Sequence, residues 1–125
     1  MLTVEREYST PDIPKPWKRK ISFPTKEAKS FVKGFGEVAA EMTEKRKVAL
    51  TLGVEFTPFR EIVKVGKNFH VVLTMLVDGQ ISMQMTNHWS WKRDNLDDEY
   101  VTSLFIPSIY TEVLMKRMAE MVKDG

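Results

Sequence analysis

The sequence predicts a single domain of the α+β class, in which helices at about residues 25–44 and 107–123 accompany an antiparallel sheet of about four to five strands. Apolar residues repeat at helical spacing in both of these segments, and between them they alternate with a period of two. The dipeptide Asp78-Gly79, a strong hairpin signal, divides the alternating part. The chain has 125 residues, 42% of them hydrophobic and 29% charged, which is the length and balance of one folded domain.

Residues 1–24 are predicted to form an extended basic arm, ahead of a folded domain at residues 25–125. Proline has no amide hydrogen and favours extended geometry in the residue before it. We therefore expect at most one short strand in the arm, near Leu2–Tyr8. The prolines on which this prediction depends are Pro11, Pro14, Pro16 and Pro24.

The first helix is predicted from Thr25 onward, where one apolar stripe follows the helical repeat. Gly34 and Gly36 interrupt this helix, and each glycine costs about 1 kcal/mol relative to alanine. Their presence indicates either a close approach between helix and sheet or a local break. The stripe consists of Ala28, Phe31, Val32, Phe35, Val38, Ala39 and Met42.

The alternation of apolar and polar residues predicts four strands before residue 89. Residues 48–56 alternate strictly, as in a half-buried strand, and residues 59–65 form the next one. Residues 69–77 and 80–88 flank Asp78-Gly79, which predicts a hairpin with a type I′ turn.

The C-terminal part is predicted to contain an acidic loop, one short strand and the last helix. Asp94–Glu99 is the loop and Tyr100–Ile106 is the strand. Pro107 and Ser108 are residues typical of a helix start. On this helix four apolar residues are expected to point broadly one way: Ile109, Val113, Met118 and Met121.

A two-residue turn at Asp78-Gly79 would pair Val77 with Gln80 and Leu76 with Ile81. This register puts His70 on a core face and leaves a second, mixed face on which each apolar residue lies opposite a polar one. Such a face suits a ligand groove or a protein partner, although an exposed sheet face with a few tolerated apolar residues gives the same pattern. The candidate residues of the mixed face are Phe69, Val71, Leu73, Met75, Ser82, Gln84, Thr86 and His88.

Few groups in the sequence suit catalysis or metal binding. There is no cysteine, and the two histidines, His70 and His88, fall on opposite faces in the predicted register. The acidic run Asp94–Glu99 lacks the glycine and the ligand spacing of a calcium loop. No nucleophile, base and orienting group come together. We therefore predict no metal and no cofactor, and the balance of the sequence favours a protein without enzymatic activity.

Basic and aromatic residues occur together in two places. Residues 15–33 carry seven basic side chains and one acidic one. Lysine and arginine neutralise phosphates, and tryptophan stacks on an unpaired base, which contributes about 1–3 kcal/mol per base. Tryptophans that anchor the loops, with solvated basic residues around them, are the competing interpretation. The predicted nucleic-acid contacts are Trp17, Lys18, Arg19, Lys20, Trp91, Lys92 and Arg93.

The function favoured by these patterns is a non-enzymatic module that binds single-stranded nucleic acid, either DNA or RNA. Several strands followed by a closing helix resemble, at the level of fold, the single-strand-binding modules of the Whirly and PUR types. One alternative is a protein–protein adaptor or small inhibitor that uses the arm and the mixed face. Another is a pocket for an apolar small ligand between sheet and helix. A homodimer strapped together by the arm is a further possibility.

The sequence also predicts where the protein resides. The absence of cysteine fits a reducing compartment. No apolar run approaches the roughly 20 residues that cross a bilayer, and the charged start, Met1–Glu7, has no signal-peptide core. We therefore expect a cytoplasmic protein that does not bind a membrane.

Overall fold

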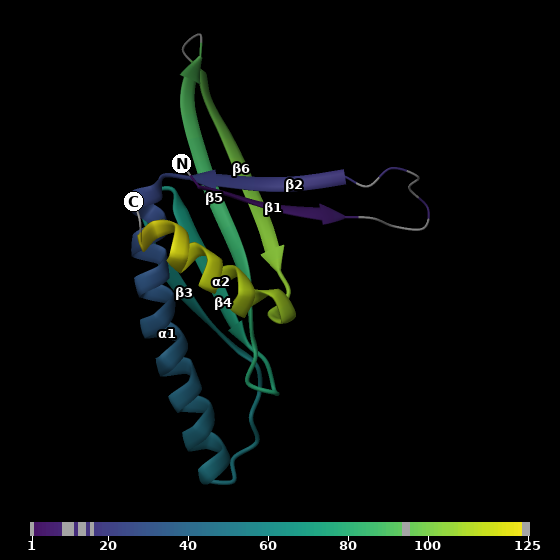
Figure 1. The fold of residues 1–125 in the computed structure, drawn as a ribbon, viewed down its shortest axis with the longest axis vertical. Coiled ribbons are helices and arrows are strands. Elements are labelled where there is room, and N and C mark those ends of the chain that lie inside the picture. Colours follow the sequence, from purple (N-terminus) through teal and green to yellow (C-terminus); the bar gives the residue numbers. More distant parts are fainter. Residues whose placement is uncertain (1, 9–11, 13–14, 16, 94–95, 124–125) are drawn as a thin grey trace.

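The computed structural model describes residues 2–8, 12, 15, 17–93 and 96–123, with the backbone alone for residues 8, 17, 89–93 and 96–100. The strands of this part form a four-stranded antiparallel sheet in the order β3-β4-β5-β6 and a two-stranded antiparallel ribbon, β1-β2 (Figure 1). The predicted α+β class is therefore confirmed. The elements are β1 (Leu2–Tyr8), β2 (Trp17–Phe23), α1 (Thr25–Thr51), β3 (Phe59–Lys64), β4 (Phe69–Met75), β5 (Ile81–Arg93), β6 (Leu96–Ile106) and α2 (Ser108–Lys123).

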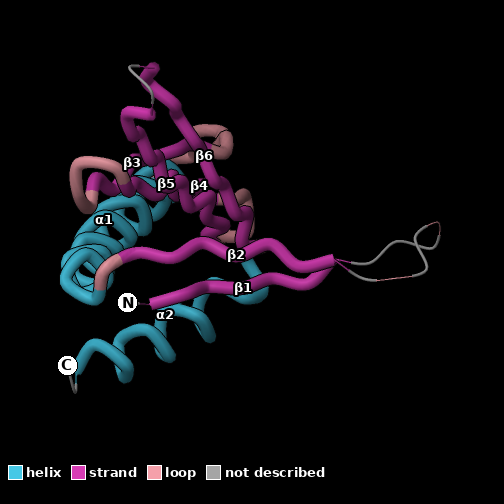
Figure 2. The backbone as a smooth tube through the Cα atoms, turned by 90° about the horizontal axis from the view of Figure 1, so that it is seen from above, coloured by secondary structure: helices cyan, strands magenta, loops and turns pink. Residues whose placement is uncertain are grey.

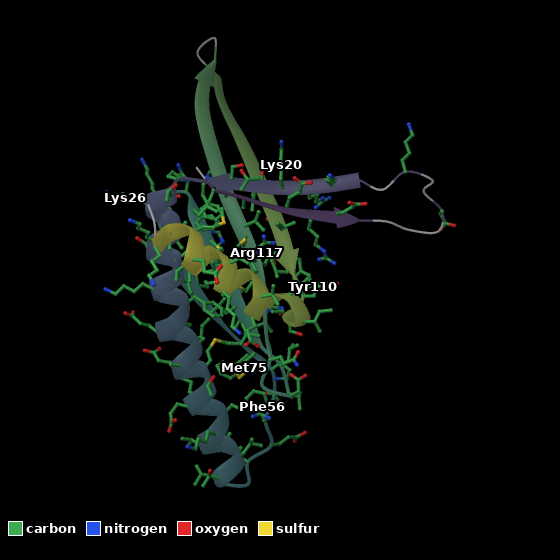
Figure 3. All side chains as sticks on the ribbon, in the orientation of Figure 1. Lys20, Lys26, Phe56, Met75, Tyr110 and Arg117 are labelled. Carbon is green, nitrogen blue, oxygen red and sulfur yellow. The ribbon has the colours of Figure 1, made fainter. Side chains whose placement is uncertain are left out.

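Both helices and the β1-β2 ribbon lie on the same side of the four-stranded sheet (Figure 2). The ring of Phe69 in β4 stacks on Phe23 of β2 at 4.4 Å between centroids and meets Phe31 of α1 edge-on at 6.2 Å. Met75 of β4 is buried between α1 and the sheet (Figure 3). These contacts join ribbon, helix and sheet into one core, which also contains Val71, Leu73, Met83, Met85, Leu104 and Ile106.

Helix α1 begins at Thr25, as predicted, but continues to Thr51. The predicted strand at residues 48–56 is therefore wrong. The helix ends at Gly53, whose φ of 70° is the left-handed conformation that glycine adopts readily. There the amide of Gly53 donates to the carbonyl of Leu50, and the amide of Val54 donates to that of Ala49. This pair of bonds is a Schellman motif. The alternating valines and leucines of this segment are exposed, so no sheet accounts for their spacing.

Gly34 marks a close approach of α1 to the sheet, the first of the two possibilities that the sequence indicated. A Cβ atom at this position would lie 2.9 Å from Cγ1 of Val63 in β3, and the helix continues through it without a break. Gly36 has nothing within 4 Å of the corresponding point. Packing therefore requires glycine at only one of the two positions.

Residues 1–24 do not form a separate arm. The strand at Leu2–Tyr8 is confirmed, but it pairs with a second strand, β2, that was not predicted. The register aligns Leu2 with Phe23 and Val4 with Ile21, and all four side chains are buried. The apolar alternation of the two segments thus outweighs the prolines, of which Pro11, Pro14 and Pro16 lie outside the described residues.

Strands β5 and β6 are longer than predicted, because residues 96–99 pair with β5 instead of forming a loop. Lys92 lies opposite Asp97 in this pairing. The predicted strand Tyr100–Ile106 is confirmed as the rest of β6. The other two residues of the predicted acidic loop, Asp94 and Asn95, lie outside the described part of the chain.

The β4-β5 hairpin is confirmed, but its register differs from the predicted one by one residue. The amide of Leu76 donates to the carbonyl of Gln80 at 2.8 Å, and the amide of Gly79 donates to the carbonyl of Leu76 at 2.9 Å. Gly79 has a φ of 88°. These features define a three-residue loop, the second common way of closing a hairpin with Asp-Gly. Arg46 of α1 donates two hydrogen bonds to the carbonyl of Val77, at 3.2 and 3.1 Å, and so ties the loop to the helix.

A shift of one residue exchanges the two faces of β4. Phe69, Val71, Leu73 and Met75 are buried in the core and pair with β5 residues 81–87. The mixed face predicted from the sequence is therefore wrong, because these four residues lie on the opposite face from Gln84 and Thr86. The face away from the helices, here called the open face, carries His70, Val72 and Thr74 of β4, with Ser82, Gln84 and Thr86 as their β5 partners.

Helix α2 spans Ser108–Lys123, close to the predicted range. Its buried stripe differs from the predicted one, since of the four expected residues only Met118 is buried. Ile109, Val113 and Met121 are exposed. The stripe follows the helical repeat of three and four residues and consists of Thr111, Met115, Met118 and Val122.

The two helical glycines give a matched test of the packing between α1 and β3. Gly36→Ala should raise the free energy of unfolding by about 1 kcal/mol, because alanine is the better helix former. Gly34→Ala gains the same propensity but drives a methyl group into Val63, a short branched side chain that cannot swing away. We expect no net gain there, measured by chemical denaturation of both variants. Equal stabilisation by both would contradict the close approach.

The register of the β4-β5 hairpin can be measured by NMR. Hydrogen-bonded and non-hydrogen-bonded pairs alternate from Leu76–Gln80, so Leu73–Met83 is a non-hydrogen-bonded pair, with Cα atoms about 4.5 Å apart. We expect a strong Hα–Hα cross-peak between Leu73 and Met83. A strong Hα–Hα cross-peak between Thr74 and Met83 instead would show that the loop has two residues, because those residues would then be the non-hydrogen-bonded pair.

Candidate binding face of the sheet

Polar side chains form a row across the open face, because residues at facing positions of paired strands share a face. His70 of β4 pairs with Lys64 of β3 on one side and with Thr86 of β5 on the other. Thr86 pairs in turn with Ser103 of β6, and the two hydroxyl groups are hydrogen-bonded at 3.2 Å. A lysine, a histidine and two hydroxyls therefore line up over four strands.

A hollow of about 640 Å³ lies along this row, on the side of the loop between β3 and β4. His88 enters it from β5, two residues beyond Thr86, and its amide donates to the carbonyl of Asn68 at 2.7 Å. This bond closes the end of the β4-β5 pairing. The side chains that define this histidine hollow are Ile62, Lys64, Lys67, His70, Thr86 and His88, with Val101 at its β6 side.

The described lining of the histidine hollow carries two lysines. Lys64 and Lys67 are exposed at its rim, and the described side chains that line it include no carboxylate. Glu27 of α1 approaches Gly66 in the loop, but it is not among the lining residues. Positive charge at the rim of a concave surface attracts anions, so Lys64 and Lys67 favour an anionic ligand there.

The basic residues predicted on β2 lie beside the open face. Lys18, Arg19 and Lys20 border a second hollow, of about 440 Å³, together with residues 101–103 of β6. Figure 3 shows Lys20 where the ribbon crosses the long strands. Val101 lines both hollows, so the basic segment of β2 and the histidine hollow adjoin across the edge of the sheet.

Acidic residues of β1 offset part of this positive charge. Glu5 lies opposite Lys20 and Glu7 opposite Lys18 in the ribbon. The Nζ atom of Lys18 also lies 3.2 Å from a carboxylate oxygen of Glu5. The net charge that the ribbon presents to a ligand is therefore smaller than the sequence of residues 15–33 indicates.

The two tryptophan clusters predicted from the sequence are not brought together. Trp17 pairs with Tyr8 at the end of the β1-β2 ribbon. Trp91, Lys92 and Arg93 end β5, and their register partners are residues 96–98. The β1-β2 ribbon and the β5-β6 hairpin cross and point in different directions (Figure 1), so a site composed of both tryptophans is not formed. The side chains of Trp17 and residues 91–93 lie outside the described part of the structure.

Sequence reasoning missed His70 because the assumed register placed it in the core. It missed Lys64 and Lys67 because they adjoin His70 only in the folded sheet. A signal that could have found them was present. Phe69, Val71, Leu73 and Met75 form the more apolar set of alternate residues in this strand, and the more apolar set faces the core. In the hypothesis of an apolar pocket, Gln84 and Ser82 would both point inward to orient the ligand. Gln84 is exposed on the open face, whereas Ser82, on the same face, is buried.

Within the part of the chain that the structure describes, no group of three or more histidine, cysteine or acidic side chains is arranged to hold a metal ion. In the same part, no helix is long and apolar enough to cross a membrane. No protein family matches the sequence, and no curated protein or solved structure is significantly similar to it. The functional argument therefore depends on the chemistry of the open face.

Proposed function

We propose that this protein binds single-stranded nucleic acid on the open face of its four-stranded sheet. One observation carries the proposal: two lysines and two histidines border a hollow on a sheet face that also exposes apolar and aromatic side chains. The proposal keeps the ligand class expected from the sequence but places the main contacts on other residues.

The cations of this face suit the phosphate backbone. Lys64 and Lys67 border the histidine hollow, and Lys18 and Lys20 adjoin it across the edge of β6. Each lysine that neutralises a phosphate releases a counterion, which is the main source of affinity in binding without sequence preference. A strand that crosses the face from β3 to β6 meets both groups of lysines.

The apolar side chains of the same face suit unpaired bases. Phe105 of β6 is 48% exposed, and Ile62 and Val101 are each 58% exposed. The register places Ile62, Val72, Gln84 and Phe105 in one row across the sheet. Aromatic side chains on a sheet stack on bases that are not paired, and an adjacent amide can hydrogen-bond to their edges. A duplex hides these base surfaces, so we propose a single strand as the ligand. The proposal includes the cytoplasmic location expected from the sequence.

Binding can be tested by the fluorescence anisotropy of a labelled oligonucleotide over a range of salt concentrations. For each lysine that contacts a phosphate, the slope of log K against log[salt] should fall by about 0.7 on substitution. We expect Lys64→Ala and Lys67→Ala to reduce the slope. Lys116→Ala is the control, since Lys116 is an exposed lysine on α2, on the other side of the sheet. Absence of binding at low salt would overturn the proposal.

Phe105→Ala should act differently from the lysine variants. Loss of one stacked base costs about 1–3 kcal/mol, or roughly 5- to 150-fold in affinity, with the salt slope unchanged. The same anisotropy titration measures both quantities. An unchanged affinity for Phe105→Ala, with a slope reduced only by Lys18→Ala and Lys20→Ala, would place the strand on the β1-β2 ribbon and not on the open face.

A further inference from the structure

The two histidines of the chain lie on the same face, in the same hollow. His70 is directly opposite Thr86, and His88 follows Thr86 by two residues on the same strand. Residues in this diagonal relation lie about 7–8 Å apart, and both side chains are half-buried. Two imidazoles so placed can approach one phosphate from two sides.

The two lysines near the histidines suit a phosphate that gains negative charge during a reaction. Lys64 is the register partner of His70, and Lys67 lies at the rim of the same hollow. Fixed cations next to the reacting group stabilise the additional negative charge of a phosphoryl-transfer transition state. Thr86 lies opposite His70 and two residues before His88, and its hydroxyl is hydrogen-bonded to that of Ser103.

We infer that the histidine hollow cleaves single-stranded RNA by transfer of the phosphate to the neighbouring 2′-hydroxyl. One histidine, neutral, takes the proton of the 2′-hydroxyl, while O2′ forms a bond to phosphorus and the bond from phosphorus to O5′ breaks. The other histidine, protonated, gives its proton to O5′. The products are a 2′,3′-cyclic phosphate and a free 5′-hydroxyl, so protons and bonds balance and no other reactant is consumed.

This chemistry needs no nucleophile from the protein, because the ribose supplies it. The sequence favoured a non-enzymatic protein because no nucleophile, activating base and orienting group come together. That argument does not apply to this reaction, in which the nucleophile belongs to the RNA. What the reaction requires is two groups that exchange protons near neutral pH, for which histidine is suited. The inference rests on the proposed function, since the RNA must first bind to the open face.

The experiment uses a labelled DNA strand with one ribonucleotide, together with an all-deoxy strand of the same sequence. The full chain should cut the first strand only at the ribonucleotide in the presence of EDTA, with a cyclic phosphate in the product by mass spectrometry. The rate should show a bell-shaped dependence on pH. His70→Ala and His88→Ala should each lower the rate at least about 100-fold. Lys116→Ala, purified in the same way, should cut at the normal rate.

Binding of the all-deoxy strand, measured by anisotropy on the same samples, separates the two proposals. Bound deoxy strand without cleavage of the ribonucleotide would overturn the inference and leave the proposed function standing, whereas no binding of either strand would overturn both. Cleavage that persists in the double histidine variant would show a contaminating nuclease and overturn the inference. The variants His70→Gln and His88→Gln, which keep polar side chains of similar size, should lower the cleavage rate at least about 100-fold and lower the affinity for the deoxy strand far less, because lysines supply the phosphate contacts.

Discussion

The hydrogen bond between the amide of Leu76 and the carbonyl of Gln80 sets the register of the β4-β5 hairpin, and the arrangement of both sheet faces depends on it. Arg46 supports this register from α1 by donating to the carbonyl of Val77 inside the loop. Gly79 permits it, because its φ of 88° is unfavourable for other residues. Helix and sheet thus hold the loop in the form that directs Phe69 into the core and His70 out of it.

The sequence was sufficient for the parts of the fold that depend on local periodicity. The start of α1, the strands on either side of Asp78-Gly79 and the range of α2 follow from repeats that neighbouring residues impose. It was insufficient at residues 48–56, where alternating apolar residues are compatible with a strand. Gly53 is the local signal that decides between strand and helix: it ends the helix in a Schellman motif, so residues 48–51 belong to the helix.

The candidate site was harder to predict than the fold, for a physical reason. Asp-Gly closes hairpins with loops of two or three residues, and these loops differ by a single residue in register. That difference decides whether His70 and His88 lie on opposite faces or in one hollow. The basic segment at residues 18–20 could be recognised from composition alone, whereas its position beside Val101 depends on how the ribbon crosses β6.

The packing of the ribbon also constrains the order in which the chain folds. Arg6 donates to the carbonyl of Phe105, 99 residues away, and Asn87 donates to the carbonyl of Ser22, 65 residues away. During synthesis the β1-β2 ribbon therefore emerges long before β6, which it contacts. Contacts so distant in sequence slow folding, and until they form, Leu2 and Val4 remain without the core that buries them. Until the sheet forms, the apolar face of the ribbon therefore stays exposed, and exposed apolar surface is prone to aggregation.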